Sequence, residues 1–127
     1  METPIARFGT ERAKDIPGRK GGTIVVVEDP FIQKYVRSLL SRHGCQVAAS
    51  DVAGALEMLR SKTEPVSLVI TNTPRDFLAV ADSVPVLYIA AAPDYELATF
   101  FLACRVLRKP FHPNQLVELV KELTAPV

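Results

Sequence analysis

The chain lacks most features that mark metal-binding or disulfide-stapled proteins. It has two cysteines, two histidines and no tryptophan among 127 residues. Cys45 and Cys104 stand far apart without CxxC spacing, and neither His43 nor His112 has metal-ligand spacing to a cysteine or to the other histidine. We therefore expect two reduced thiols in a cytoplasmic protein, with no disulfide framework.

Long apolar runs and a strong net charge are also missing. No run approaches the roughly 20 apolar residues that span a bilayer, and the N-terminus lacks the apolar segment of a signal peptide. The formal net charge of +1 gives no global field for nucleic acid or a membrane surface. Hydrophobic residues make up 48% of the chain, enough for the core of one domain. We therefore expect one domain with no membrane or nucleic-acid partner.

Two regions differ in composition. Residues 1–22 combine prolines and glycines with scattered charges, which predicts a flexible tail or linker. From Thr23 onward, short β-branched runs alternate with helical apolar stripes, which predicts a domain over 23–127. The expected strands cover 24–27, 45–49, 67–71, 84–89 and 104–107. Such alternation predicts an α/β fold in which a five-stranded parallel sheet is doubly wound by helices on both faces.

The connection between the third and fourth strands is short. Residues 74–83 can form at most about three helical turns, whereas a parallel crossover normally uses a full helix. We expect a shortened third helix or an irregular link that covers its sheet face thinly and exposes an apolar patch there. Phe100 and Phe101, in the next helical segment, are expected in the core.

Polar residues gather where the strands end. Ligand chemistry in such sheets lies beyond the carboxyl ends of the strands. Glu28 and Asp29 follow the first strand, Asn72 the third, Ala90 the fourth and Lys109 the fifth. Carboxylates hold Mg²⁺ through oxygen, a further carboxylate can accept a phosphoryl group, and a lysine can neutralise phosphoryl oxygens.

Four segments give the chain a resemblance to the receiver domains of response regulators. They are IVVVEDPFI at 24–32, LVITN at 68–72, VPVLYIA at 84–90 and LRKPF at 107–111. The resemblance covers about 23–123. It implies a flavodoxin-like sheet with strand order 2-1-3-4-5 and a role in two-component phosphorelay signalling. It also implies a phosphate-contacting Lys109 and a cis Lys109–Pro110 peptide bond.

The chain departs from the family at several matching positions. Asn72 stands at the phosphoacceptor position, and an uncharged amide is a far poorer nucleophile than a carboxylate. Ala90 replaces the switching hydroxyl residue, and Val106 stands where the family often has a switching aromatic. The register of the acidic turn stays open. Counted from the strand, Glu28 and Asp29 form the pair; counted from the helix, Glu28 is the second acid and Val27 occupies the first position.

These departures define the functional hypotheses. The first is a non-enzymatic pseudo-receiver, in which Glu28 and Asp29 bind Mg²⁺ weakly if at all and Lys109 pairs with one of them. Its partner would be a histidine kinase or another signalling protein, and a homodimer is compatible with the sequence. Because the family docks partners on its fourth helix, fifth strand and fifth helix, the resemblance makes Tyr95 or Phe101 a candidate docking residue.

The second hypothesis is a working receiver phosphorylated on another carboxylate such as Asp29 or Asp76. The third is a small flavodoxin-like ligand-binding protein, although the chain has no glycine-rich phosphate loop.

Overall fold

The computed structural model describes residues 22–62 and 64–125. The flexible tail predicted for residues 1–22 lies, apart from Gly22, outside the described residues. The first strand begins at Thr23, where the sequence pattern changes. Within the described ranges, no helix is long and apolar enough to cross a membrane.

The strands form one parallel five-stranded sheet, as the sequence predicted. Their order across the sheet is β2-β1-β3-β4-β5, and each neighbouring pair is parallel. The strands are β1 (Thr23–Val27), β2 (Val47–Ala49), β3 (Val66–Thr71), β4 (Val86–Ala90) and β5 (Cys104–Arg108). Because all five run the same way, their carboxyl ends meet at one edge.

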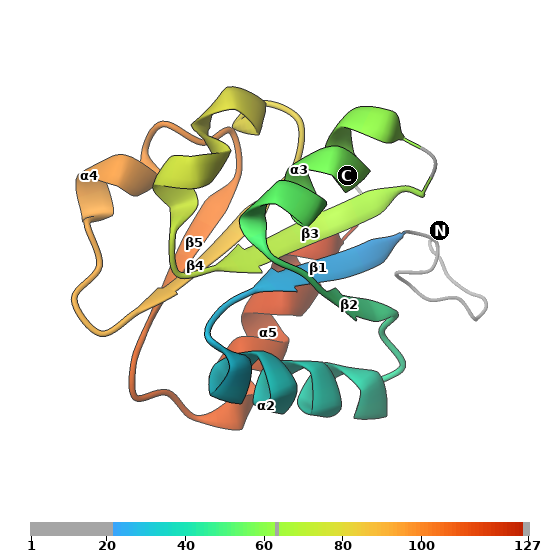
Figure 1. Cartoon of the computed structure of the whole chain (residues 1–127). Coiled ribbons are helices and arrows are strands. Elements are labelled where there is room, and N and C mark those ends of the chain that lie inside the picture. Colours follow the sequence, from blue (N-terminus) through green and yellow to red (C-terminus); the bar gives the residue numbers. More distant parts are fainter. Residues whose placement is uncertain (1–21, 63, 126–127) are drawn as a thin grey trace.

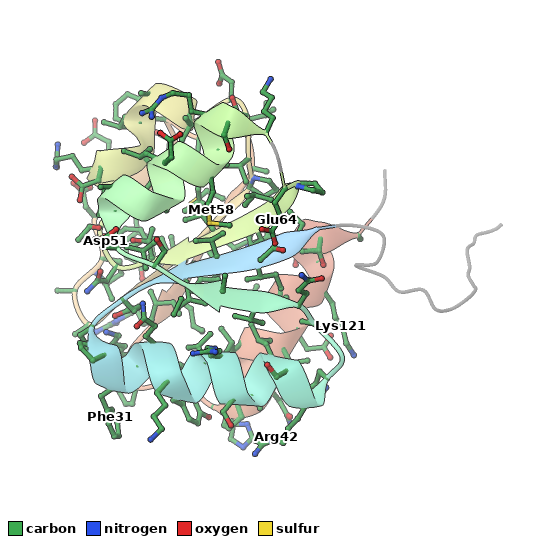
Figure 2. All side chains as sticks on the ribbon, turned by 45° about the vertical axis from the view of Figure 1, so that its right-hand side comes forward. Phe31, Arg42, Asp51, Met58, Glu64 and Lys121 are labelled. Atoms are coloured by element: carbon green, nitrogen blue, oxygen red, sulfur yellow. The ribbon has the colours of Figure 1, made fainter. Side chains whose placement is uncertain are left out.

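The helices cover both faces of the sheet (Figure 1). α2 (Pro30–Arg42) and α5 (Pro113–Thr124) lie on one face, whereas α3 (Val52–Ser61), the 3₁₀ helix η1 (Pro74–Val80) and α4 (Tyr95–Ala98) lie on the other. The β-branched strands fit this arrangement because alternate side chains enter a core on each side. Val26 and Ile70 pack in the core under α2 and α5, whereas Val25 and Val69 pack in the core under α3 and η1. In Figure 2, α2 lies along the sheet with its outer side chains pointing away from it.

The third crossover is shortened, as predicted, but the expected thin covering of the sheet is wrong. The seven residues of η1 form a 3₁₀ helix, which rises about 2.0 Å per residue against about 1.5 Å in an α-helix. The short segment therefore reaches across the sheet. The Phe77 side chain is fully buried in the core, and Pro74, Ala81 and Val84 are buried with it.

Phe100 is also placed differently from the prediction. α4 ends at Ala98, and the chain leaves the helix before Phe100, whose side chain is 61% exposed. Phe101 points the other way and is buried, so of the two aromatic residues only Phe101 joins the core. Its burial also removes Phe101 as a docking candidate, whereas Tyr95 is exposed.

Candidate functional site at the strand ends

Glu28 and Lys109 meet at the carboxyl edge of the sheet. The Glu28 side chain is completely buried, and its Oε2 lies 3.4 Å from Lys109 Nζ. Its Oε1 accepts hydrogen bonds from the Asp29 backbone N–H at 3.1 Å and from Lys109 Nζ at 3.5 Å. Lys109 is positioned by its backbone N–H, which donates to the Ala90 carbonyl at 2.9 Å. The Lys109–Pro110 bond that follows is cis, the geometry implied by the resemblance.

Burial dominates the electrostatics of Glu28. Removal from water raises the pKa of this carboxyl, and the Asp29 N–H and the Lys109 ammonium lower it by smaller amounts. The Oε2 atom is buried and accepts no hydrogen bond from the described residues. The carboxylate therefore depends on the charge of Lys109, because few hydrogen bonds replace its lost water.

Asp29 has a different role from Glu28. Its carboxylate accepts the Ile32 N–H at 3.2 Å and caps α2, and Pro30 occupies the first helical position. Asp29 is exposed and does not line the cavity beside Glu28, whereas Val27 does. The geometry thus matches the register counted from the helix. Of the two acids that the sequence placed in an acidic pocket, the structure brings only Glu28 to Lys109.

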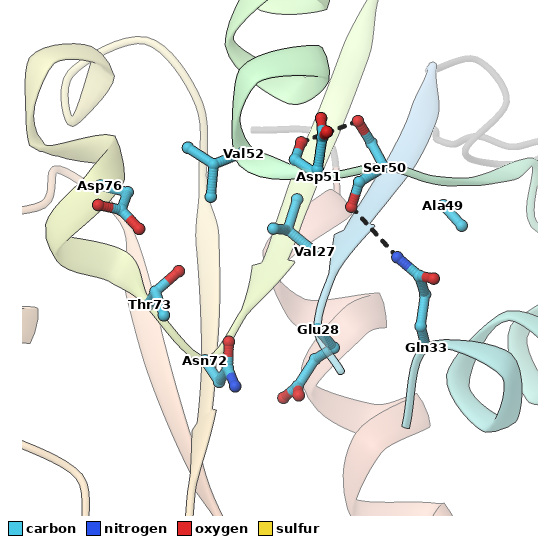
Figure 3. Close-up of a pocket in the computed structure, with 10 residues that line it drawn as sticks. All are labelled: Val27, Glu28, Gln33, Ala49, Ser50, Asp51, Val52, Asn72, Thr73 and Asp76. Atoms are coloured by element: carbon cyan, nitrogen blue, oxygen red, sulfur yellow. Dashed lines mark hydrogen bonds between the residues drawn. The ribbon is translucent and has the colours of Figure 1, made fainter. Parts of the chain in front are cut away.

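Asn72 lies in a cavity of about 480 Å³ at the ends of β1, β2 and β3. Figure 3 shows the Glu28 carboxylate directed toward the side of the cavity on which Asn72 lies. Thr71, just before Asn72, is fully buried, and its hydroxyl accepts the Thr73 backbone N–H at 3.0 Å. That bond fixes the turn after β3. Asn72 lies within this turn, and its side chain is partly exposed.

The β2 side of the cavity was missed by the sequence reasoning. Gln33 Nε2 donates to the carbonyl of Val26 in β1 at 3.1 Å. It also donates to the carbonyl of Ser50, just after β2, at 3.2 Å (Figure 3), and so ties α2 to both strands. Asp51 also lines the cavity, although its Oδ1 accepts the Gly54 N–H at 2.7 Å and caps α3. The sequence analysis considered the residues that follow the first, third, fourth and fifth strands. The residues that follow β2 are Ser50 and Asp51, so the same criterion would have identified them.

Several solved structures that share this architecture are receiver domains. A response-regulator receiver protein from Sinorhizobium medicae is 23% identical with a TM-score of 0.65, over 80% of this chain and 92% of that one. One from Burkholderia phymatum is 22% identical with a TM-score of 0.68, over 84% and 97%. The receiver domain of the hybrid histidine kinase CckA is 23% identical with a TM-score of 0.60, over 81% and 99%.

The chain has the receiver-domain fold. No protein-family model and no curated protein matches its sequence, and the structural matches at these identities establish the fold alone.

The structure places the two residues that the resemblance aligned with switch positions in and opposite β4. Ala90 ends β4 and is only partly buried, and Val106 lies in β5 opposite Tyr88. The hydroxyl of the buried Tyr88 accepts the Asp94 N–H at 3.0 Å, which fixes the loop that leads into α4. Neither Ala90 nor Val106 has a polar atom in its side chain with which to respond to a phosphoryl group.

The residues at this edge do not fit a magnesium ion. Mg²⁺ requires near-octahedral oxygen coordination, usually from carboxylates and water. Glu28 is already paired with Lys109, Asp29 is used as a helix cap, and Asn72 contributes no charge. Among the described residues there is no group of three or more Asp, Glu, His or Cys side chains placed to hold a metal ion.

Proposed function

We propose that this protein is a non-enzymatic pseudo-receiver, a protein-interaction module of two-component signalling that works without phosphorylation at the usual position. One observation carries the proposal: Asn72 follows β3 in the cavity that Glu28 also lines, and the buried Glu28 is paired with Lys109. A neutral amide offers no carboxylate oxygen for acyl phosphate formation.

The Glu28–Lys109 pair supports the same proposal from the electrostatic side. A lysine that contacts phosphoryl oxygens must offer them its positive charge. Here the buried carboxylate of Glu28 balances that charge, although the Lys109 side chain keeps 24% of its surface exposed, so the arrangement is complete without phosphate. A signal would then leave through contacts between surfaces. We propose a histidine kinase or another signalling protein in the cytoplasm as the partner.

The proposal is tested by incubation of the protein with Mg²⁺ and acetyl phosphate, followed by intact-protein mass spectrometry. We expect no gain of a phosphoryl group. A receiver domain that retains its aspartate, treated in parallel, should gain one and so shows that the reagent is active. A stable adduct on this chain would contradict the proposal.

Asp76 supplies the rival function. Its exposed carboxylate lines the same cavity as Asn72, and no other described side chain engages it. If the protein does gain a phosphoryl group, the variants Asp76→Asn and Asp29→Asn identify the carboxylate that carries it. An adduct lost only in Asp76→Asn would make the protein a receiver with a displaced acceptor.

A further inference from the structure

The exposed large hydrophobic side chains belong to two groups of elements. Figure 1 shows that these elements lie on opposite faces of the sheet. Phe31 and Tyr35 lie on α2, and the others lie on the η1 and α4 side. The second group is Leu78, Tyr95, Phe100 and Leu102. Exposed apolar residues gathered in patches, rather than scattered singly, mark interaction sites on soluble proteins.

The first group lies in a positively charged setting. Phe31 is 80% exposed, and α2 carries three exposed cations and no acid along its thirteen residues. Within the described part of the chain these cations take part in no ion pair. Figure 2 shows Phe31 and Arg42 projecting from the outer side of α2. We call this the basic surface, formed by Phe31, Lys34, Tyr35, Arg37 and Arg42.

The second group lies in a negatively charged setting. Residues 74–102 contain four acids and one cation, Arg75, which lies 4.0 Å from Asp94. That pair and the hydrogen bond from Leu102 N–H to the Ala81 carbonyl at 3.1 Å hold η1 beside the α4 segment. Phe100 and Leu102 are the most exposed apolar residues there, at 61% and 78%. We call this the acidic surface, formed by Leu78, Asp82, Tyr95, Glu96, Phe100 and Leu102.

We propose that copies of this chain associate head to tail, the basic surface of one copy docking on the acidic surface of the next. Each surface combines apolar side chains with charges mainly of one sign, the exceptions nearby being Asp29 and Arg75, and the prevailing signs are opposite. Two basic or two acidic surfaces facing each other would repel, which disfavours a two-fold symmetric dimer. The proposal goes beyond the signalling role above and does not depend on whether Asn72 or any acid is phosphorylated.

The placement of the two surfaces determines the size of the assemblies that head-to-tail association can form. Because they lie on opposite faces of the sheet, a docked pair leaves one basic and one acidic surface free. Further copies can then add, and such contacts form a ring if the rotation closes and an open chain if it does not. The average mass should therefore rise with concentration beyond that of a dimer. It should fall at high salt, because screening weakens the attraction between exposed charges.

Sedimentation velocity on the full chain, with no phosphodonor present, tests the proposal. One variant, Phe31→Ser with Lys34→Ser, disrupts the basic surface by removing its most exposed apolar side chain and one cation. The other, Phe100→Ser with Leu102→Ser, disrupts the acidic surface by removing its two most exposed apolar side chains. All four side chains are exposed, and urea unfolding should confirm that both variants fold. Each variant alone should remain monomeric at concentrations where the wild type assembles. An equimolar mixture should give twice the monomer mass and nothing larger, since each variant keeps the surface that the other lacks.

Three results would overturn the proposal. The first is a wild type that stays monomeric at low salt and the highest accessible concentration. The second is association abolished by only one of the two variants, which would indicate a symmetric interface. The third is a mixture that stays monomeric, which would mean that the two surfaces do not bind each other.

Discussion

Glu28 makes the stability of this protein depend on pH. Its carboxyl is buried, and the folded state raises its pKa above the ordinary value of 4.5. The folded chain therefore holds the proton of the Glu28 carboxyl more tightly than the unfolded chain does. The corresponding contribution to stability is complete below the ordinary pKa and is lost as the pH rises through the folded pKa.

Glu28→Gln tests this dependence, because glutamine stays neutral at every pH. We expect the free energy of unfolding of the variant, minus that of the wild type, to increase as the pH rises from about 4 to about 7. Urea titrations at several pH values measure it. Glu118→Gln is the control, since Glu118 also lies beside a lysine but is exposed, and its effect should be much smaller. A difference that falls with pH would mean that Lys109 outweighs burial.

At the residue scale, the sequence predicted the proximity of the site residues more successfully than it predicted the role of each residue. Glu28, Asn72 and Lys109 follow strand ends, and a parallel sheet brings such residues together whatever their roles. The sequence could not predict that Glu28 pairs with Lys109 while Asp29 caps α2, because these roles depend on where α2 begins. Asp29 suits a helix cap and a metal site equally well by residue type, and only the turn geometry separates the two roles.

Among the elements, α2 depends on its cap at Asp29. Asp29→Ala removes the acceptor for the Ile32 N–H and should cost about 1 kcal/mol of stability. Asp29→Asn keeps that acceptor and should lose much less. Urea unfolding of both variants in metal-free buffer measures the two losses. Equal losses would show that the charge of Asp29, rather than its cap, stabilises the protein.

The 3₁₀ helix η1 depends on one side chain, Phe77. Its ring is fully buried in the core shared with Ala55, Val69 and Phe101. Phe77→Ala should lower the free energy of unfolding by about 3–5 kcal/mol, since it leaves a cavity in a short element. The neighbouring Leu78→Ala, at a side chain 39% exposed, is the matched control and should cost less than about 1 kcal/mol. Similar losses for both would mean that η1 is not anchored through Phe77.

The contrast between β-strands and η1 explains how far the fold could be predicted. Runs such as Ile24-Val25-Val26-Val27 favour a strand buried on both faces, and five of them separated by helical stripes leave few topologies. Residues 74–83 have no comparable period. The hydrophobic pattern therefore did not reveal that a 3₁₀ helix would bury Phe77, nor that α4 would end early and leave Phe100 outside.

At the scale of the whole molecule, the sheet divides the core into two layers, and each layer holds one cysteine. Cys45 packs against the core under α2 and α5, and Cys104 against the core under α3 and η1. Burial raises the pKa of both thiols, that of Cys104 to about 11. Few thiolates therefore exist at neutral pH in the folded protein, and the thiolate is the reactive form.

Thiol labelling can therefore report whether the two layers unfold together. Every central strand contributes alternate residues to both layers, so loss of one layer exposes the strands that support the other. For a single domain of this size we expect one cooperative transition. Pulsed alkylation across a urea series should show Cys45 and Cys104 becoming reactive at the same midpoint, which should match the loss of helical circular dichroism. Labelling of Cys104 at lower urea than Cys45 would show instead that the layer with the short helices η1 and α4 opens first.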